Sequence, residues 1–288
     1  MKIIFSRKGF DSSFGGHPSP IFEDNTMISL PIPGKSKINY GKLNFAANQE
    51  NINMGKFLEK IGRVKSSHLA HLDPDIYPEM ITRKEGWRAS LGQVDAAQSH
   101  LAGQKIEVGD LFLFFGWFRR IRKVNDGWQW YGEHLHSLFG YLEIGEILHL
   151  GSKPKESDYC KIYPWLENHP HLTGSRSDNN TLYLASEKLS LDNKLPGGGS
   201  LGIFSEHLQL TAPGQAKSLW QVPNWLDNRL TYHKDEARWQ KKENNLYLQT
   251  VAKGQEFVFT AEDKNQEINL WLDNLFKKSL AKKIKLTN

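Results

Sequence analysis

The sequence of 288 residues has little cysteine and no long apolar run, and both absences narrow the class of protein. Cys160 is the single cysteine, so an intrachain disulfide and a cysteine-based zinc or iron–sulfur site are excluded. The longest apolar run, near residues 111–118, is broken by Gly116 and falls well short of the roughly 18 residues that a membrane span needs. The first residues hold too few apolar side chains for a secretory segment, so we expect a cytoplasmic protein that spans no membrane.

Acidic residues are absent from the last stretch of the chain. Residues 277–288 contain five lysines and no Asp or Glu, and they account for the whole formal net charge of +5. The rest of the chain is formally neutral, so it lacks the broad basic surface of a protein that coats DNA nonspecifically. We expect residues 281–288 to form a basic tail.

The pattern of apolar residues predicts a mixed, strand-rich α+β fold in a single domain over residues 1–280. Helical spacing occurs in the first third, at 55–64 and 92–102, and near the C-terminus at 266–280. Strand-like segments separated by turn residues are predicted at 3–5, 26–30, 111–115, 139–148, 181–185, 200–204, 207–211, 246–251 and 256–260.

A loop with two cations follows the first predicted strand. If residues 3–5 form a strand, Ser6, Arg7, Lys8 and Asp11 lie at its C-terminal end, where open α/β sheets bind ligands. Backbone amides, hydroxyls and the two cations can hold a phosphate group. Asp11 is a candidate base or nucleophile, or else a turn residue bonded to its own backbone.

The segment HLDPD at 71–75 carries one imidazole and two carboxylates. In an extended chain, His71, Asp73 and Asp75 point to the same side. Such a set can hold a hard divalent metal ion or act as a general acid and base. The alternative is ordinary Asp-Pro-Asp turn chemistry.

The segment GWRASLGQVDAAQSHL at 86–101 carries a polar stripe. On a helix, Gln93 and His100 share one face with a small alanine between them, and Gln98 lies beside it. Amide groups read base edges and sugar hydroxyls through paired donors and acceptors. We therefore take these three residues and Arg88 as substrate-binding candidates; the alternative is a solvated helix face.

Residues 105–150 resemble two strands of a small barrel of the PUA type. Aromatic residues between the strands, including Trp128 and Trp130, either stack on a base or pack in the core.

Two weaker motifs follow. In HPH, His169 and His171 share a face if the chain is extended, and in KGQEFVF, Glu256 is either catalytic or exposed.

Taken in order, these motifs resemble the nucleotide modification associated domain 3 family of bacteria and phages. The matching segments include SRKGFDSSFGGHPSPI, HLDPD, GWRASLGQVDAAQSHL, GDLFLFFGWFR, FGYLEIGEI, HPH, NTLYLAS, SLWQVPNWL and KGQEFVF. The resemblance implies a link to systems that alter DNA bases or nucleotides. Its motif-bearing positions here are Ser6, Arg7, Lys8, Asp11, His71, Asp73, Asp75, Gln93, Gln98 and His100.

The leading hypothesis is an enzyme that modifies a nucleotide or a DNA base, with group transfer favoured by the family resemblance. Arg7 and Lys8 would hold phosphate, and the polar stripe would recognise base or sugar. Asp11, His71, Asp73 and Asp75 would supply acid–base groups, or the last three would ligate a divalent metal; the sequence does not identify a cofactor beyond that metal. The alternatives are a PUA-like reader of modified nucleic acid and a metal-dependent nuclease or defence effector.

Overall fold

The computed structural model describes the backbone of the chain except residues 63, 252–255, 262–265 and 287–288, and its side chains as far as Lys277. The α-helices in this part are α1 (Met54–Ile61), α2 (Asp95–Gly103), α3 (Glu156–Cys160) and α4 (Gln266–Leu286). The strands are β1 (Lys2–Arg7), β2 (Ser19–Ile21), β3 (Asn44–Ala47), β4 (Glu50–Asn53), β5 (Ser90–Gln93), β6 (Leu111–Val124), β7 (Gly127–His149), β8 (Thr181–Ala185), β9 (Gly198–Ser200), β10 (Leu219–Val222), β11 (Trp239–Lys242), β12 (Asn245–Gln249) and β13 (Glu256–Thr260).

One large mixed sheet forms the centre of the molecule, with the strand order β13-β1-β6-β7-β8-β5. Strand β1 runs parallel to β6, and the other neighbours along this path are antiparallel. The Gln93 side chain of β5 nevertheless hydrogen-bonds Glu256 of β13, at the opposite end of the strand order. The sheet therefore curls until its two outer strands approach each other, and the polar site described below lies where they meet.

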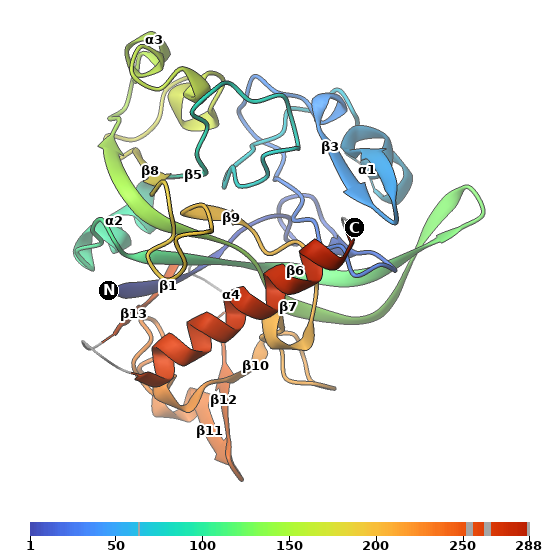
Figure 1. The fold of residues 1–288 in the computed structure, drawn as a ribbon, viewed down its shortest axis with the longest axis vertical. Coiled ribbons are helices and arrows are strands. Elements are labelled where there is room, and N and C mark those ends of the chain that lie inside the picture. The colour runs from blue at the N-terminus through green and yellow to red at the C-terminus, as the bar shows by residue number, and fades with distance from the viewer. Residues whose placement is uncertain (63, 252–255, 262–265, 287–288) are drawn as a thin grey trace.

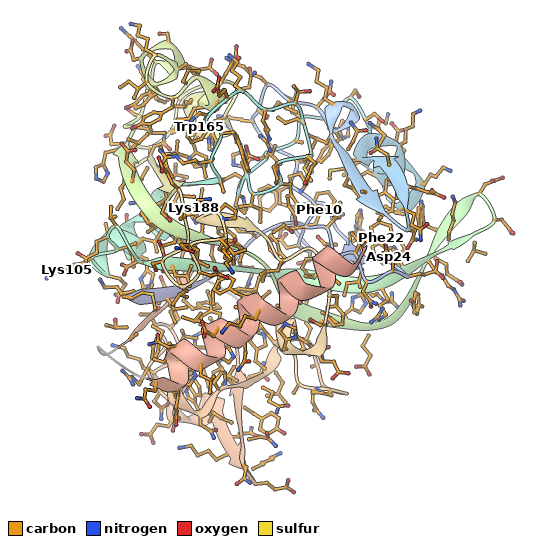
Figure 2. All side chains as sticks on the ribbon, in the orientation of Figure 1. Phe10, Phe22, Asp24, Lys105, Trp165 and Lys188 are labelled. Atoms are coloured by element: carbon orange, nitrogen blue, oxygen red, sulfur yellow. The ribbon has the colours of Figure 1, made fainter. Side chains whose placement is uncertain are left out.

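The two faces of β1 lie in different surroundings because successive side chains of a strand alternate. Phe5 packs against Trp220 of β10 and Trp271 of α4, so this face is covered by the small sheet β10-β12-β11 and the C-terminal helix (Figure 1). Ser6 points to the other face and is fully buried. Side chains fill the space between the ribbons, while Lys105 is exposed at the outer edge beside α2 (Figure 2).

The predicted strand-rich α+β class is confirmed, and so is the C-terminal helix. The apolar stripe of that helix is buried through Ile268, Leu272, Leu275 and Phe276. The helix continues to Leu286, so most of the predicted basic tail is helical.

Strands β6 and β7 form one long hairpin within the large sheet, and the PUA-like subdomain at 105–150 stays a prediction. No helix in the described ranges is long and apolar enough to cross a membrane.

Four sequence predictions of elements were wrong. Residues 26–30 make isolated bridges rather than a strand, residues 200–204 form a strand only at Ser200, and residues 207–211 begin in a 3-10 turn. The helix predicted at 92–102 begins only at Asp95. Gly92 and Gln93 belong instead to β5, because Gln93 pairs with Thr181 of β8. Pairing between distant strands here outweighs the helical preference of the alanines that follow.

Candidate functional site

A buried carboxylate gathers three donors at the C-terminal end of β1. Oε1 of Glu256 accepts hydrogen bonds from the Ser6 hydroxyl and the Lys8 ammonium, both at 3.1 Å, and from the Gln93 side-chain amide. The side chain of Glu256 is 1% exposed and that of Lys8 is 9% exposed. We call Ser6, Lys8, Gln93 and Glu256 the carboxylate cluster. It joins β1, β5 and β13, which are far apart in the sequence.

The second oxygen of this carboxylate, Oε2, is buried and has no hydrogen-bond partner among the described residues. Leaving a buried polar atom unpaired costs roughly 1–3 kcal/mol, and more when the group is charged. An ionised carboxylate oxygen only accepts hydrogen bonds. The cluster therefore presents one unused acceptor to whatever polar group can reach it.

A second cluster lies beside β5 and contains two imidazoles and one carboxylate. Oδ2 of Asp73 lies 3.9 Å from Nε2 of His71 and 3.5 Å from Nε2 of His171. The ligand atoms of these three residues all lie within 4.8 Å of one another, an arrangement able to hold a metal ion. We call His71, Asp73 and His171 the histidine–aspartate cluster.

Burial and charge act in opposite directions in this cluster. Burial alone would raise the pKa of Asp73, but the adjacent His171 ring and the other neighbouring imidazoles outweigh it and hold that pKa well below its ordinary range. Asp73 therefore stays ionised at neutral pH. Burial lowers the pKa of His71, and it lowers the pKa of nearby His169 to about 3. Both of these imidazoles are neutral at pH 7.

Consecutive residues of β5 hold the two clusters. The backbone N–H of Gly92 donates to Oδ1 of Asp73 at 2.7 Å, and the next residue, Gln93, donates to Glu256. A Cβ atom at Gly92 would lie 2.2 Å from the His171 ring, so only glycine leaves room for that imidazole. Strand β5 thus connects two groups of charged side chains.

The extended pattern predicted that Asp75 would join His71 and Asp73, and this prediction was wrong. The Asp75 carboxylate forms a two-pronged ion pair with Arg83, with Nη1 at 2.7 Å from Oδ2, and it also accepts from the Trp87 indole. Burial raises the pKa of Asp75, and the Arg83 charge opposes that rise. The backbone of Asp75 bridges Ser90, and its side chain meets a cation eight residues further along the chain.

Arg7 and Asp11 make contacts with groups outside the carboxylate cluster. The Arg7 guanidinium lies 5.7 Å from the Phe115 ring centre and 5.8 Å from that of Phe257, and it donates to the Val251 carbonyl. Asp11 accepts hydrogen bonds from the backbone N–H groups two and three residues later. Its position matches the turn-forming alternative.

The remaining substrate-binding candidates contact protein groups. Gln98 accepts from the Tyr183 hydroxyl at 2.9 Å and is buried, whereas His100 lies 3.1 Å from the Thr231 hydroxyl. Arg88 donates to the Ala185 carbonyl and lies near Glu146. Gln93 lies in β5 and Gln98 and His100 in α2, so the structure does not form the single helical stripe that the sequence predicted.

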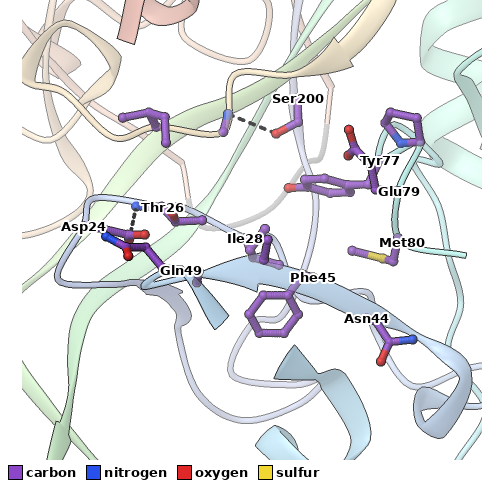
Figure 3. A pocket seen from close by; sticks show the side chains of 15 residues that line it. Asp24, Thr26, Ile28, Asn44, Phe45, Gln49, Tyr77, Glu79, Met80 and Ser200 are labelled. Carbon is purple, nitrogen blue, oxygen red and sulfur yellow. Dashed lines mark hydrogen bonds between the residues drawn. The ribbon is translucent and has the colours of Figure 1, made fainter. Parts of the chain in front are cut away.

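One cavity of about 420 Å³ is lined by Arg88 together with Trp87 and Trp165. Another, of about 450 Å³, is mostly apolar and is lined by side chains that include Ile28, Phe45 and Met80, as Figure 3 shows. None of the sequence-predicted site residues lines it. A smaller cavity of about 110 Å³ lies beside the Asp75 ion pair and is lined by Ser90 and His169 as well.

Two residues of these clusters have only a weak signal in the sequence. His171 was visible only in the HPH motif, and Glu256 only as the polar residue that opens an apolar strand. The residues KGQ that precede Glu256 in this motif, 253–255, lie outside the described residues.

The model of one protein family, described as nucleotide modification associated domain 3, matches residues 2–260. The chain belongs to this family. The match includes both clusters and the whole of the curled sheet, and it confirms the resemblance noted in the sequence. No curated protein and no solved structure matches the chain.

Proposed function

We propose that this member of the nucleotide modification associated domain 3 family is an enzyme that modifies a nucleotide or a DNA base by group transfer. The family description ties the chain to nucleotide modification. The observation that carries the proposal is the buried Glu256 carboxylate, which has one oxygen held by three donors and the other without a partner among the described residues.

The chemistry of the carboxylate cluster fits such a substrate. Exocyclic amino groups of bases and hydroxyls of sugars are hydrogen-bond donors, and an unused carboxylate oxygen is an acceptor for them. A carboxylate at that position can also take the proton that leaves when the amino or hydroxyl group attacks a group donor, as the bond between the transferred group and its carrier breaks and the carrier departs with the electron pair. Lys8 and Ser6 hold the other oxygen, so the carboxylate stays in a fixed orientation.

The histidine–aspartate cluster and the carboxylate cluster lie on opposite faces of β5, because a Cβ at Gly92 would face the His171 ring, the next side chain, Gln93, bonds Glu256, and successive side chains of a strand alternate. We include both clusters in one proposed reaction centre, in which a single substrate would reach around β5. Asp73 and His71 remain the proposed acid–base or metal-ligating groups. Asp11 and Asp75, which bond within their own turn and to Arg83, become positioning residues in this proposal.

A reader of modified nucleic acid is a second candidate, and one observation favours it. The Lys217 ammonium lies 3.9 Å from the centre of the Trp117 ring, near the surface beside His134. An aromatic ring with a cation can take a base and its phosphate. Trp128, by contrast, is half-buried and packs in T-shaped contacts against the core residues Phe22 and Phe57, so it serves packing.

The proposal is tested in bacterial cells that produce the protein, because the cytoplasm, where we expect the protein to act, then supplies the group donor. Nucleosides from the DNA and from the nucleotide pool are compared by mass spectrometry for the wild type, Glu256→Gln, Asp73→Asn and Asp11→Asn. We expect a new nucleoside mass with the wild type and with Asp11→Asn, whose amide oxygen can still accept the turn hydrogen bonds. Glu256→Gln and Asp73→Asn should give none.

Other outcomes separate the alternatives. If no new mass forms but purified protein binds DNA and loses binding on Trp117→Ala, the protein is a reader and the enzymatic proposal is wrong. Degradation of plasmid DNA after a divalent metal is added would identify a nuclease instead. A new mass that persists in Glu256→Gln would remove that carboxylate from the mechanism.

A further inference from the structure

The hydrogen bonds around the histidine–aspartate cluster fix which atoms face its centre. Nδ1 of His71 lies 3.1 Å from the Lys35 backbone carbonyl, which can only accept. That nitrogen therefore carries the hydrogen, and Nε2 of the neutral ring keeps its lone pair. Oδ1 of Asp73 is taken by the Gly92 N–H, which leaves Oδ2 for the centre.

The neighbouring amide fixes which nitrogen of His171 faces Asp73. The Asn180 side-chain nitrogen donates to the His171 backbone carbonyl at 3.0 Å, so the amide oxygen must face the ring. That oxygen lies 2.8 Å from Nδ1 of His171 and needs a donor there. Nδ1 therefore carries a hydrogen, and Nε2 is the nitrogen of His171 that faces Asp73.

Three atoms able to ligate a metal ion thus converge, two imidazole nitrogens and one carboxylate oxygen. The separations of 3.5 and 3.9 Å exceed the roughly 2.7–3.2 Å of an N–H···O hydrogen bond. They approach the spacing of ligands on one ion, because two atoms each about 2.1 Å from a metal at the tetrahedral angle lie roughly 3.4 Å apart. Converging lone pairs repel one another unless a cation lies between them.

We propose that His71 Nε2, Asp73 Oδ2 and His171 Nε2 bind one divalent transition-metal ion. The outward hydrogen bonds from both rings to a carbonyl and an amide oxygen are those that orient metal-ligating histidines in proteins. Two imidazoles select ions such as Zn²⁺ and Co²⁺ over Mg²⁺ and Ca²⁺, which prefer oxygen ligands. Three protein ligands leave at least one position open for water or substrate.

His169 is excluded from this ligand set by the same reasoning, although it is close by. Its Nδ1 accepts the backbone N–H of His171 at 3.2 Å, so its hydrogen is on Nε2. An N–H group cannot ligate a metal. The ion reaches the site past His71, whose side chain is 13% exposed, while those of Asp73 and His171 are 5% and 4% exposed.

The test uses the full-length protein, freed of metal with a chelator and titrated with Co²⁺ and Zn²⁺ in the absence of nucleotide. We expect one equivalent of Co²⁺ with visible absorption bands that Zn²⁺ abolishes and a hundredfold excess of Mg²⁺ does not. His71→Gln and Asp73→Asn should weaken binding more than roughly a hundredfold, and Asn180→Ala by roughly 10- to 100-fold. His169→Gln is the matched control and should keep the one-to-one stoichiometry.

Circular dichroism and thermal unfolding show whether each variant folds. His71 is the most exposed ligand, so His71→Gln keeps the test valid if Asp73→Asn fails to fold. Absence of stoichiometric Co²⁺ binding by the wild type, or equal affinity in folded His71→Gln, would overturn the proposal. Neither result bears on the Glu256 proposal, because no nucleotide chemistry is measured.

Discussion

Replacing Gly92 with alanine tests whether the packing of β5 holds the histidine–aspartate cluster in place. The added Cβ would lie 2.2 Å from the His171 ring, whereas ordinary contacts begin at 3.4 Å, so the ring must move by about 1.2 Å. Asn180 restrains that movement, because it bonds both the ring nitrogen and the backbone carbonyl of His171. Overpacking of this kind typically costs about 1–3 kcal/mol.

We therefore expect Gly92→Ala to lower the free energy of unfolding by about 1–3 kcal/mol, measured by urea denaturation with a chelator present. Co²⁺ affinity should fall by at least about tenfold, because a shift of that size exceeds the tolerance of about 0.2 Å in a metal–ligand distance. Gly103→Ala is the control, since a Cβ there meets no atom within 4 Å. Wild-type stability and Co²⁺ affinity in Gly92→Ala would refute the reasoning.

Three further predictions concern buried charges. Glu256→Gln leaves the Lys8 ammonium without its counter-charge and should lower the free energy of unfolding by about 3–5 kcal/mol. Adding Lys8→Met should restore part of this loss in a double-mutant cycle, and strict additivity of the two changes would contradict the prediction. Arg83→Met removes the counter-charge of Asp75, and burial already raises the pKa of that carboxyl group. A raised carboxyl pKa in the folded state favours folding at low pH, so urea denaturation should show a smaller loss of unfolding free energy at pH 5 than at pH 7.5. Burial lowers the pKa of His136 to about 3, so this group destabilises the folded state once the pH falls below the ordinary histidine pKa of about 6.5. His136→Gln should therefore lose about 1 kcal/mol less unfolding free energy than the wild type between pH 7 and pH 5.5, and parallel plots of stability against pH would be the contrary result.

Local patterns in the sequence predicted much of the fold. The stripe of α4 and the apolar run of β6 are visible because each element buries one face or both, and burial leaves a period in the sequence. The sequence pattern predicts a helix at Gln93 because the alanines after it favour one. Its pairing with Thr181, 88 positions away, is a tertiary contact that no local period records.

The candidate site was predicted only in part for the same reason. Ser6, Lys8, His71, Asp73 and Gln93 do lie in the two clusters. The partners that complete them, His171 and Glu256, come from segments about 100 and 160 residues further along the chain. Spacing along an extended chain predicted that Asp75 would join, but Arg83 pairs with it instead. Which distant side chain completes a site depends on strand pairing, and the curled sheet that brings β5 to β13 has no local signature.

The most direct test of one reaction centre around β5 is the visible spectrum of the Co²⁺-loaded protein during titration with the four deoxynucleoside monophosphates and a short DNA strand. The account predicts that a ligand which binds, as measured by calorimetry, also changes the Co²⁺ absorption bands, and that Glu256→Gln weakens its binding. A ligand that binds the wild type and leaves the Co²⁺ spectrum unchanged would contradict the claim that both clusters serve one substrate.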